Sequence, residues 1–370
     1  MEKTKVLSIG YDKDLFDPNS RASRRIVRYG ELFGELNIIV FTRRIEGFKE
    51  TKLSPEVTVF PTNAVSKIGM ISNAYFLGKK IGKGTKVITT QDPFESGFVG
   101  FMLKNNLEAK LHIQEHGDFF SSSYWRKESF MNNFRIIFGR FVLKRADRVR
   151  VVAKRIKNTL IKLGVNESKI DVSNVYTERS FVSENKKEDK EKFTFISVGR
   201  LVPQKNFDLL LSAFSDLSDE IKSSSELVVV GDGFLMDHFK IKIKSLGLEE
   251  KIKLMGHQKD IKEFYNRANV FVLSSNYEGW GRVILEAAMA KLPVIMTDVG
   301  CAGELIKDKE SGLIVPIGDK QKLKEAMEYA FKNRETMKGF AERAFSEVME
   351  TSSEEDSILA FAQSVIKTSI

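Results

Sequence analysis

The sequence predicts an α/β protein made of two Rossmann-like, doubly wound domains that face each other across a cleft. The chain has 370 residues, which is too long for one compact core and suits two domains of ordinary size. Short apolar runs alternate with amphipathic helical stretches along its whole length, as in parallel sheets with helices on both faces. A charged segment without apolar residues, 183–192, interrupts this alternation near the middle of the chain.

The predicted strands fall into two series, and helical patterns fill most of the gaps between them. The first series comprises Lys5–Gly10, Ile38–Thr42, Val57–Phe60, Val87–Thr90, Leu111–Gln114 and Val149–Ala153. The second series comprises Phe193–Val198, Leu227–Val230, Ile252–Met255, Val270–Ser274, Pro293–Thr297 and Leu313–Pro316. Two such series in one chain predict two separate parallel sheets.

The composition of segment 183–192 is that of a solvated linker, so the domain boundary is predicted next to it. The first predicted domain spans residues 1–180, and the second spans residues 181–352. Residues 353–370 form a short amphipathic helix that is expected to pack back on the first domain. In open parallel sheets ligands bind beyond the carboxyl ends of the strands, so the residues that follow each strand are the candidates for a site.

The single cysteine, Cys301, excludes an internal disulfide framework and fits a reducing compartment. Residues 1–10 lead directly into a strand-like run and lack the apolar region and cleavage site of a signal peptide. No stretch approaches the roughly 18 uninterrupted apolar residues of a membrane-spanning helix. We therefore expect a cytoplasmic protein, and peripheral binding to the inner face of the cell membrane stays open.

The net charge of +9 is concentrated in one part of the chain. Residues 126–162 contain twelve lysines and arginines against two acids, Glu128 and Asp147, and so carry a net charge of +10. The rest of the chain is close to neutral. An anionic partner is therefore expected to bind at this basic segment.

Apolar residues recur at helical spacing within the basic segment: Phe130, Met131, Phe134, Ile137, Phe138, Phe141 and Val142. We favour burial of this face against a sheet, because a helix that covers a Rossmann sheet needs such a stripe. Contact with an anionic membrane is the second interpretation, since basic helices with aromatic residues bind such surfaces. Nucleic acid ranks last, because no recognition motif or stacking platform accompanies the charge.

The strongest chemical signal follows the predicted strand that starts at Val270. A turn with two glycines, Gly279 and Gly281, leads into a helix, and two glutamates stand eight positions apart, Glu278 and Glu286. Glycines let the backbone approach a ligand closely, and a helix start offers unpaired N–H groups to an anion. A carboxylate such as Glu286 can accept both hydroxyls of a ribose. The alternative is an ordinary strand–turn–helix with a capping acid.

Two further strand ends carry polar or glycine-rich turns. Gly199 begins a loop with two cations, Arg200 and Lys205, which can meet the growing negative charge of a pyrophosphate leaving group. The alternative for this loop is a solvated basic surface. Gly231 opens the turn Gly-Asp-Gly after another strand, and a tight turn after a buried strand explains this turn equally well.

Taken together, these motifs resemble the large retaining glycosyltransferase family with the GT-B fold, known as family 4 or glycosyl transferases group 1. The E-x7-E motif of that family corresponds to Glu278 and Glu286, and its Gly-Arg-Leu-x-x-x-Lys loop corresponds to residues 199–205. The Val-Gly-Asp-Gly turn corresponds to residues 230–233, and the end of the nucleotide domain resembles residues 311–316. The similarity runs in order over roughly Phe193 to Asp319.

The resemblance implies transfer of a hexose from an NDP-sugar, a UDP- or GDP-sugar, to a hydroxyl of a glycan or of a lipid-linked envelope precursor. It implies no metal and no further cofactor, with the acceptor on the first domain and the donor on the second. The implied catalytic residues are His116, Glu278, Arg200 and Lys205. The implied donor-binding residues are Gly199, Arg200, Lys205, Gly231, His257, Gln258, Gly281, Arg282, Val283 and Glu286.

Within this scheme each group has an expected role. Arg200 and Lys205 bind the diphosphate together with backbone N–H groups of residues 281–283, and Glu286 holds the ribose. Glu278 contacts the transferred sugar, and His116 bonds a sugar hydroxyl or a backbone group near the reacting carbon. His257 and Gln258 lie beside the base. The sequence leaves the base, the sugar, the acceptor and the oligomeric state open.

Three alternatives remain. A nucleotide-sugar epimerase or a sugar phosphorylase can share this fold, and a non-catalytic nucleotide-sugar-binding protein can keep the same domain.

A different pattern, His-x-x-Glu-His at His112 to His116, resembles the zinc site of a peptidase family. Residues 111–114 are predicted as strand, however, where positions four apart are about 13 Å from each other and do not share one metal.

Overall fold

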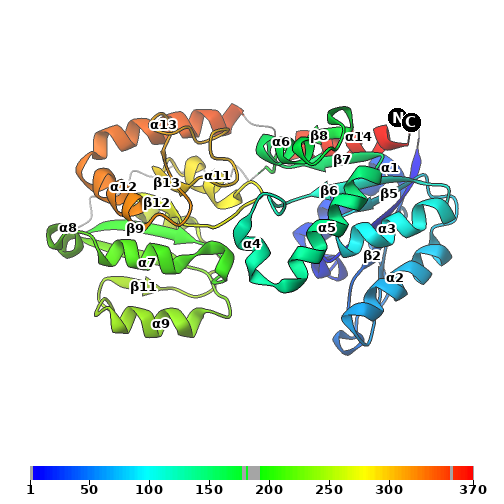
Figure 1. The fold of residues 1–370 in the computed structure, drawn as a ribbon, viewed down its shortest axis with the longest axis horizontal. Helices are drawn as coiled ribbons and strands as arrows, with labels where there is room; N and C mark the ends of the chain where they lie inside the picture. Colours follow the sequence, from blue (N-terminus) through cyan, green and yellow to red (C-terminus); the bar gives the residue numbers. More distant parts are fainter. Residues whose placement is uncertain (1–2, 177–180, 182–191, 351–352, 370) are drawn as a thin grey trace. The chain divides into compact units, whose positions relative to one another are not determined.

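The fold is described from a computed structural model, in which residues 3–176, 181, 192–350 and 353–369 are placed. The chain divides into two compact units. The first unit contains Met1–Ser121, Ser129–Asn174 and Glu355–Ile370, and the second contains Ser122–Glu128 and Val175–Glu354. Each unit has its own sheet (Figure 1) and its own hydrophobic core, and each is described by itself.

The first unit is built on an eight-stranded sheet in the order β3-β4-β2-β1-β5-β6-β7-β8. The strands are β1 (Thr4–Gly10), β2 (Gly34–Val40), β3 (Thr51–Lys52), β4 (Val57–Pro61), β5 (Val87–Thr90), β6 (Lys110–Glu115), β7 (Arg148–Val151) and β8 (Ile170–Val172). All neighbours pair in parallel except β3 and β4. The chain moves outward from β1 to one edge and then returns to β5, so the sheet is doubly wound.

Six α-helices belong to this sheet: α1 (Arg21–Phe33), α2 (Lys67–Ile81), α3 (Glu95–Asn106), α5 (Phe130–Arg145), α6 (Lys154–Lys162) and α14 (Glu354–Thr368). In Figure 1, α2, α3 and α5 lie side by side in front of the sheet, and α3 contacts both of the others. The predicted strand at 38–42 lies four residues too late, because β2 begins at Gly34 with a half-buried stretch that alternates polar and apolar residues.

The terminal helix α14 packs on the first unit. Its residues Phe361, Ala362 and Val365 are part of the hydrophobic core formed by β1, β2 and α1. Figure 1 shows the helix in red beside β8. A short polar network also holds it, since the Ser364 hydroxyl donates to Asp171 at 2.6 Å and lies 3.1 Å from Nε2 of His112.

His112 is a buried structural residue. Its Nδ1 lies 2.9 Å from the Thr89 hydroxyl, so both ring nitrogens are engaged by side chains of the core. Burial and the nearby Arg150 guanidinium lower the pKa of His112 to about 3, and the ring is therefore neutral. His112 cannot join His116 as a metal ligand in this arrangement. No group of three or more His, Cys, Asp or Glu side chains that could hold a metal occurs in the described ranges.

The second unit is built on a six-stranded, fully parallel sheet in the order β11-β10-β9-β12-β13-β14. The strands are β9 (Phe193–Val198), β10 (Ser225–Val230), β11 (Ile252–Leu254), β12 (Val270–Leu273), β13 (Val294–Thr297) and β14 (Leu313–Val315). Every residue of β9, β12 and β13 is buried, as expected for central strands covered on both faces.

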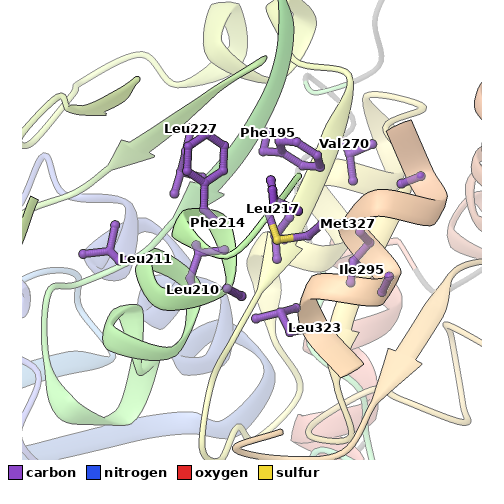
Figure 2. Packing of buried hydrophobic residues seen from close by; sticks show 14 of the residues in the cluster. Phe195, Leu210, Leu211, Phe214, Leu217, Leu227, Val270, Ile295, Leu323 and Met327 are labelled. Carbon is purple, nitrogen blue, oxygen red and sulfur yellow. The ribbon is translucent and has the colours of Figure 1, made fainter. Parts of the chain in front are cut away.

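The helices of the second unit are α4 (Ser123–Glu128), α7 (Phe207–Ser215), α8 (Asp219–Ser224), α9 (Met236–Ser245), α10 (Lys262–Arg267), α11 (Arg282–Met289), α12 (Lys320–Lys332) and α13 (Arg334–Glu350). Figure 2 shows part of the core on one side of the sheet, where Phe195 and Ile295 point toward apolar residues of α7 and α12. This packing fixes the strands whose carboxyl ends carry the chemical motifs.

One short segment from the first half of the chain belongs to the second unit. Ser122–Glu128, which contains α4, belongs to the second unit although the chain on either side of it belongs to the first. The Tyr277 hydroxyl donates to the Glu128 carboxylate at 3.0 and 3.1 Å, and Trp125 is buried. The sequence-based boundary placed all residues up to 180 in the first domain, and nothing in the composition of 122–128 signals that it belongs to the second unit.

The expectation that the apolar face of α5 is buried is wrong for most of its members. The exposed fractions are 77% for Phe130, 57% for Met131, 52% for Phe134, 70% for Ile137 and 39% for Phe141. Of the seven predicted residues only Val142 is buried, and Phe138 is partly buried. The helix instead packs on its unit through Asn132, Gly139, Val142 and Leu143. The predicted helix is present, but most of the apolar residues that predicted it face solvent, and a different face of α5 is buried.

The basic segment is likewise not a single free surface. Arg148 binds Asp171 at 3.0 Å, and Arg150 is buried and donates to the carbonyl of Ser173 at 2.7 Å. Other cations of the segment pair with acids on neighbouring elements, as in Arg135–Glu95 and Lys157–Glu167. The charge available to a partner is therefore smaller than the count of residues suggests. Among the residues that the structure places, no helix is both long enough and apolar enough to cross a bilayer.

Candidate functional site

The three motifs found in the second half of the sequence lie at the same edge of one sheet. β10, β9 and β12 are neighbours in the parallel sheet, and each motif begins where one of them ends. Because the carboxyl ends of parallel strands meet at one edge, the structure brings the loops 199–206, 231–235 and 274–281 together. This is the edge at which open α/β sheets bind their ligands.

The centre of this edge is an ion pair between Lys205 and Glu278. The Lys205 ammonium lies 2.5 Å from Oε1 of Glu278, and the two side chains are only 13% and 9% exposed. The Ser275 hydroxyl donates to the same oxygen at 2.7 Å. Burial of two opposite charges is tolerated when each has hydrogen-bond partners, and removal of one leaves the other uncompensated. Two of the four predicted catalytic residues, Lys205 and Glu278, therefore hold each other in a fixed position.

Backbone and side-chain hydrogen bonds join the loops that carry this pair. The N–H of Asn276 donates to the carbonyl of Gln204 at 2.8 Å, and the Gln204 amide donates to the carbonyl of Tyr277 at 3.0 Å. The Ser274 hydroxyl donates to the carbonyl of Lys205 at 2.9 Å. These bonds fix the distance between the loops, so the site is preorganised before any ligand binds.

Arg200 differs from Lys205 in its surroundings. It is exposed, and its guanidinium forms no hydrogen bond or ion pair with any residue of the described ranges. Burial and the Glu128 carboxylate raise the pKa of Tyr277, whereas the positive charge of Arg200 acts in the opposite direction. Arg200 is therefore close to Tyr277, at the start of the turn that contains Glu278. Within the described ranges it is therefore a cation without an acidic partner, at the edge where the three motifs meet.

Two glycines allow the loops to pack backbone against backbone. Gly231 has φ +138°, and a Cβ at this position would lie 2.0 Å from the carbonyl oxygen of Gly199. A Cβ at Gly233 would lie 2.5 Å from the carbonyl oxygen of Leu201. The N–H of Gly199 donates to the carbonyl of Val230 at 3.0 Å. The Gly-Asp-Gly turn is therefore needed to seat the Arg200 loop, whatever further role it has.

The helix α11 starts at the turn after Glu278. Gly281 is its N-cap residue, with φ +93°, and provides no side-chain cap. The N–H groups of Arg282 and Val283 lie in the first turn and have no partner within the helix. Gly300 approaches from β13, since a Cβ there would lie 2.5 Å from the carbonyl oxygen of Trp280 and 3.0 Å from Cβ of Glu278. A close backbone and an open helix start form an anion-binding geometry.

Glu286 lies in the second turn of α11 and is buried beside Tyr265 of α10. The Tyr265 hydroxyl donates to Oε2 of Glu286 at 3.0 Å. Burial and the Glu286 charge raise the pKa of Tyr265 well above its ordinary value, so the phenol keeps its proton. The ring of Phe181 lies edge-on to Tyr265, with 5.8 Å between the ring centroids. Tyr265 therefore orients the carboxylate that the sequence assigns to the ribose.

The remaining predicted residues are less constrained. His257 is exposed just beyond β11, next to Gly256, which forms an isolated bridge with Gly231. The side-chain amide of Gln258 donates to the carbonyl of Met255 at 2.7 Å and is used within its own turn. His257 and Gln258 are thus at the same sheet edge as the other motifs, while their contact with a base stays a prediction.

His116 belongs to the first unit, at the carboxyl end of β6. It is exposed, and its Nε2 lies 3.1 Å from the Gln114 side-chain carbonyl. Glu115 beside it is fully buried, and neither carboxyl oxygen has a partner in the described part of the chain. Burial and the nearby carboxyl groups of Asp92 and Asp118 raise the pKa of Glu115 well above its ordinary value.

Sequence reasoning missed the residues that support the site. Ser275 and Tyr265 bind the two glutamates, and Tyr277 binds Glu128. Ser275 stands three residues before Glu278, so its position in the strand end was visible. Tyr265 and Glu128 are distant in sequence from their partners, and only the folded chain brings them together.

Comparison with known proteins shows similarity to glycosyltransferases, strongest in the second half of the chain. Residues 178–347 match the family model described as glycosyl transferases group 1. An uncharacterized glycosyltransferase of Methanocaldococcus jannaschii is 28% identical over 74% of this chain and 74% of its own length. An N-acetylgalactosaminyltransferase of Campylobacter jejuni, whose name specifies a diphospho-undecaprenol acceptor, is 27% identical over 58% of this chain and 60% of its own length. A UDP-Gal-dependent α-1,3-galactosyltransferase of Escherichia coli is 32% identical over 48% and 50%.

Solved structures extend the similarity to the whole fold. HepE of Anabaena, determined in complex with UDP, has a TM-score of 0.72 and 17% identity over 99% of both chains. Sucrose-phosphate synthase of Thermosynechococcus elongatus has a TM-score of 0.78 and 16% identity over 97% of this chain and 98% of its own. The predicted architecture of two Rossmann-like domains is confirmed. The chain therefore has the GT-B fold, and its residues 178–347 are similar to the glycosyl transferases group 1 family.

Proposed function

We propose that this protein is a glycosyltransferase of family 4, which moves a hexose from a UDP- or GDP-sugar to a hydroxyl acceptor with retention of configuration. The observation that carries the proposal is the arrangement around Lys205 and Glu278. One cation of the edge, Lys205, is buried in an ion pair, and a second, Arg200, is exposed and has no acidic partner among the described residues. The open start of α11 adds N–H donors. This set matches a sugar nucleotide whose diphosphate leaves during the reaction.

In this mechanism the donor diphosphate binds to Arg200 and to the N–H groups at the start of α11, with Lys205 close by. As the bond from the sugar C1 to the phosphate breaks, positive charge develops on the sugar and negative charge on the leaving phosphate. Glu278 contacts the transferred sugar, and its pairing with Lys205 keeps both groups in place. The acceptor hydroxyl attacks from the face of the departing phosphate, which takes its proton. The proposal includes no metal ion, because these groups supply the positive charge.

The remaining assignments follow the resemblance. Glu286 holds the ribose, His257 and Gln258 lie beside the base, and His116 contacts the transferred sugar. The first domain, 1–180 with 353–370, binds the acceptor, and the second binds the donor. The names of the Campylobacter and Escherichia relatives specify lipid-diphosphate acceptors. We propose an acceptor of this class, a lipid-linked envelope glycan precursor, which places the reaction at the inner face of the cell membrane.

Arg200→Ala is expected to weaken the binding of a nucleoside diphosphate by roughly 10-fold to 100-fold, because one charge-assisted contact is lost. The variant should fold normally, since the side chain is exposed and its guanidinium has no partner among the residues that the structure places. The measurement is a thermal-shift titration with UDP, GDP and ADP, in which a ligand of the folded state raises the melting temperature. Arg267→Ala, at an exposed arginine of α10, is the matched control.

The same screen separates the remaining alternatives. If none of the three diphosphates raises the melting temperature of the native chain, the donor proposal is wrong. Binding without transfer to any acceptor would favour a non-catalytic nucleotide-sugar-binding protein. Conversion of the donor sugar to its epimer, detected by chromatography without added acceptor, would favour an epimerase.

Tyr265→Phe is expected to lower the affinity for UDP by about 10-fold, because Glu286 loses the hydrogen bond that orients it toward the ribose. The measurement is calorimetric titration with UDP and with its 2′-deoxy analogue. If Glu286 binds the ribose, the loss should be larger for UDP than for the analogue, which has one hydroxyl fewer. Equal losses for both ligands would show that Tyr265 supports the fold of α10 and not ribose binding.

A further inference from the structure

The helix α5 presents an apolar stripe to solvent. Phe130, Phe134, Ile137 and Phe141 recur every three or four residues and so share one face, and Met131 stands beside them. Their exposed fractions range from 39% for Phe141 to 77% for Phe130. We call these five residues the α5 stripe. A continuous exposed apolar surface of this kind marks a site of interaction.

The stripe is exposed although α5 is firmly attached to its unit. The opposite face is buried, and Gly139 lets Phe94 approach so closely that a Cβ there would lie 2.8 Å from its ring. Arg135 is bound to Glu95 of α3, and the ring of Phe138 lies edge-on to Phe98. The stripe therefore belongs to a fixed helix with its own buried face, and it is not a core face that has come loose.

Positive charge borders the stripe at its carboxyl end. Arg140, Lys144 and Arg145 are exposed, and none of them is in an ion pair with a described residue. The guanidinium of Arg145 lies over the ring of Phe141, 3.6 Å from the centroid. No acid occurs between Phe130 and Arg145. The surface is thus aromatic and aliphatic along its centre and cationic at its border.

We propose that the α5 stripe with Arg140, Lys144 and Arg145 binds the anionic surface of a lipid bilayer. Aromatic and aliphatic side chains enter the boundary between headgroups and acyl chains, and lysines and arginines at the border bind the negative headgroups. A second copy of this chain fits less well, because an isologous contact pairs α5 with itself and this helix contains no acid to meet its cations. The proposal deepens the proposed function, since a lipid-linked acceptor is reached from such a surface.

The test is co-sedimentation of the full chain, without donor, with vesicles of phosphatidylcholine and with vesicles that also contain phosphatidylglycerol. Native protein should bind the anionic vesicles more tightly, and added salt should weaken this binding. Replacing three cations, as Arg140→Gln/Lys144→Gln/Arg145→Gln, should lower the affinity by about 100-fold, from the contribution of each charge near an anionic surface. Ile137→Ser with Phe134→Ser should lower it as well, without a loss of thermal stability, because both side chains are exposed.

The matched control is Lys79→Gln/Lys80→Gln/Lys83→Gln, which removes three exposed cations in and just after α2 in the same unit. Equal losses in the two triple variants, or equal binding of native protein to both kinds of vesicle, would overturn the proposal. Reversible self-association that disappears in the Ser variant would assign the stripe to a second copy. Tight binding of single-stranded RNA through the same residues would assign it to nucleic acid.

Failure of this proposal is distinguishable from failure of the proposed function. A water-soluble acceptor analogue should be glycosylated equally well by native protein and by the triple Gln variant of α5. A vesicle-embedded acceptor should be glycosylated more slowly by the variant. If transfer fails with every acceptor while vesicle binding persists, the surface assignment stands and the reaction was assigned wrongly.

Discussion

Glu278→Gln is expected to lower the turnover number by about 1000-fold while the dissociation constant for the nucleoside diphosphate changes by no more than roughly 3-fold. Glu278 is proposed to contact the transferred sugar, where positive charge develops as the leaving group departs. A neutral amide does not stabilise that charge. The diphosphate is proposed to bind through Arg200 and the start of α11, which the substitution leaves in place.

Glutamine is the informative replacement because Glu278 is buried in an ion pair. Its amide oxygen can still accept hydrogen bonds from Lys205 and from Ser275, whereas alanine would remove the one partner that the Lys205 ammonium has among the described residues. Breaking a buried pair by removal of one side costs about 3–5 kcal/mol. Glu278→Ala therefore confounds catalysis with stability, and its melting temperature should be clearly lower than that of Glu278→Gln.

The measurement is the turnover number with the preferred donor, combined with calorimetric binding of its diphosphate. Glu249→Gln, at an exposed glutamate after α9, is the control for loss of one negative charge in the same unit. A large loss of diphosphate affinity in Glu278→Gln would show that the roles of Glu278 and Glu286 have been exchanged. Unchanged turnover would remove Glu278 from the reaction altogether.

Gly231→Ala is expected to destabilise the second unit by about 4 kcal/mol and to lower its melting temperature by about 10 °C. A Cβ at this position would lie 2.0 Å from the carbonyl oxygen of Gly199, and φ is +138°. Backbone cannot move aside as a side chain can. The loop that carries Arg200 would have to leave its place, so diphosphate affinity should fall together with stability.

Gly247→Ala is the matched control. Gly247 also has a positive φ, +65°, but a Cβ there would meet no atom within 4 Å. The substitution should cost only about 1 kcal/mol, the penalty of a left-handed backbone for a residue with a side chain. Calorimetric melting of both variants tests the comparison. Similar losses of stability would mean that φ alone, and not the close approach to Gly199, explains the need for glycine at position 231.

Most strands of the second unit can be predicted from the sequence, because buried central strands are continuous apolar runs. The strand 193–198 was predicted at its true bounds, since a central parallel strand is apolar throughout and is therefore easy to recognise. The motifs around Arg200, Gly231 and Glu278 were then placed at one sheet edge, because parallel strands end on the same side. The short edge strands Thr51–Lys52 and Ile170–Val172 were missed, since two or three residues carry too little pattern.

The sequence by itself therefore determined the α/β class, the two sheets, the motifs that follow neighbouring strands of the second sheet and the basic helix at 130–145. These properties depend on local periodicity and on the order of residues along the chain. Tertiary structure decided which groups pair and which faces are covered. Lys205 meets Glu278 across 73 positions of sequence, and Tyr265 meets Glu286 across 21.

The same reason explains why the prediction of the buried face of α5 was wrong. The period of α5 is visible in the sequence, but a helix with apolar residues on two faces does not reveal which face its sheet and neighbouring helix will cover. Gly139 and Val142 face the unit, and Phe134 and Ile137 face solvent. The ring of Phe94, next to α3, leaves room at this point of α5 for a glycine but not for a larger side chain. Contacts between distant parts of the chain are set by shape, which a one-dimensional pattern does not contain.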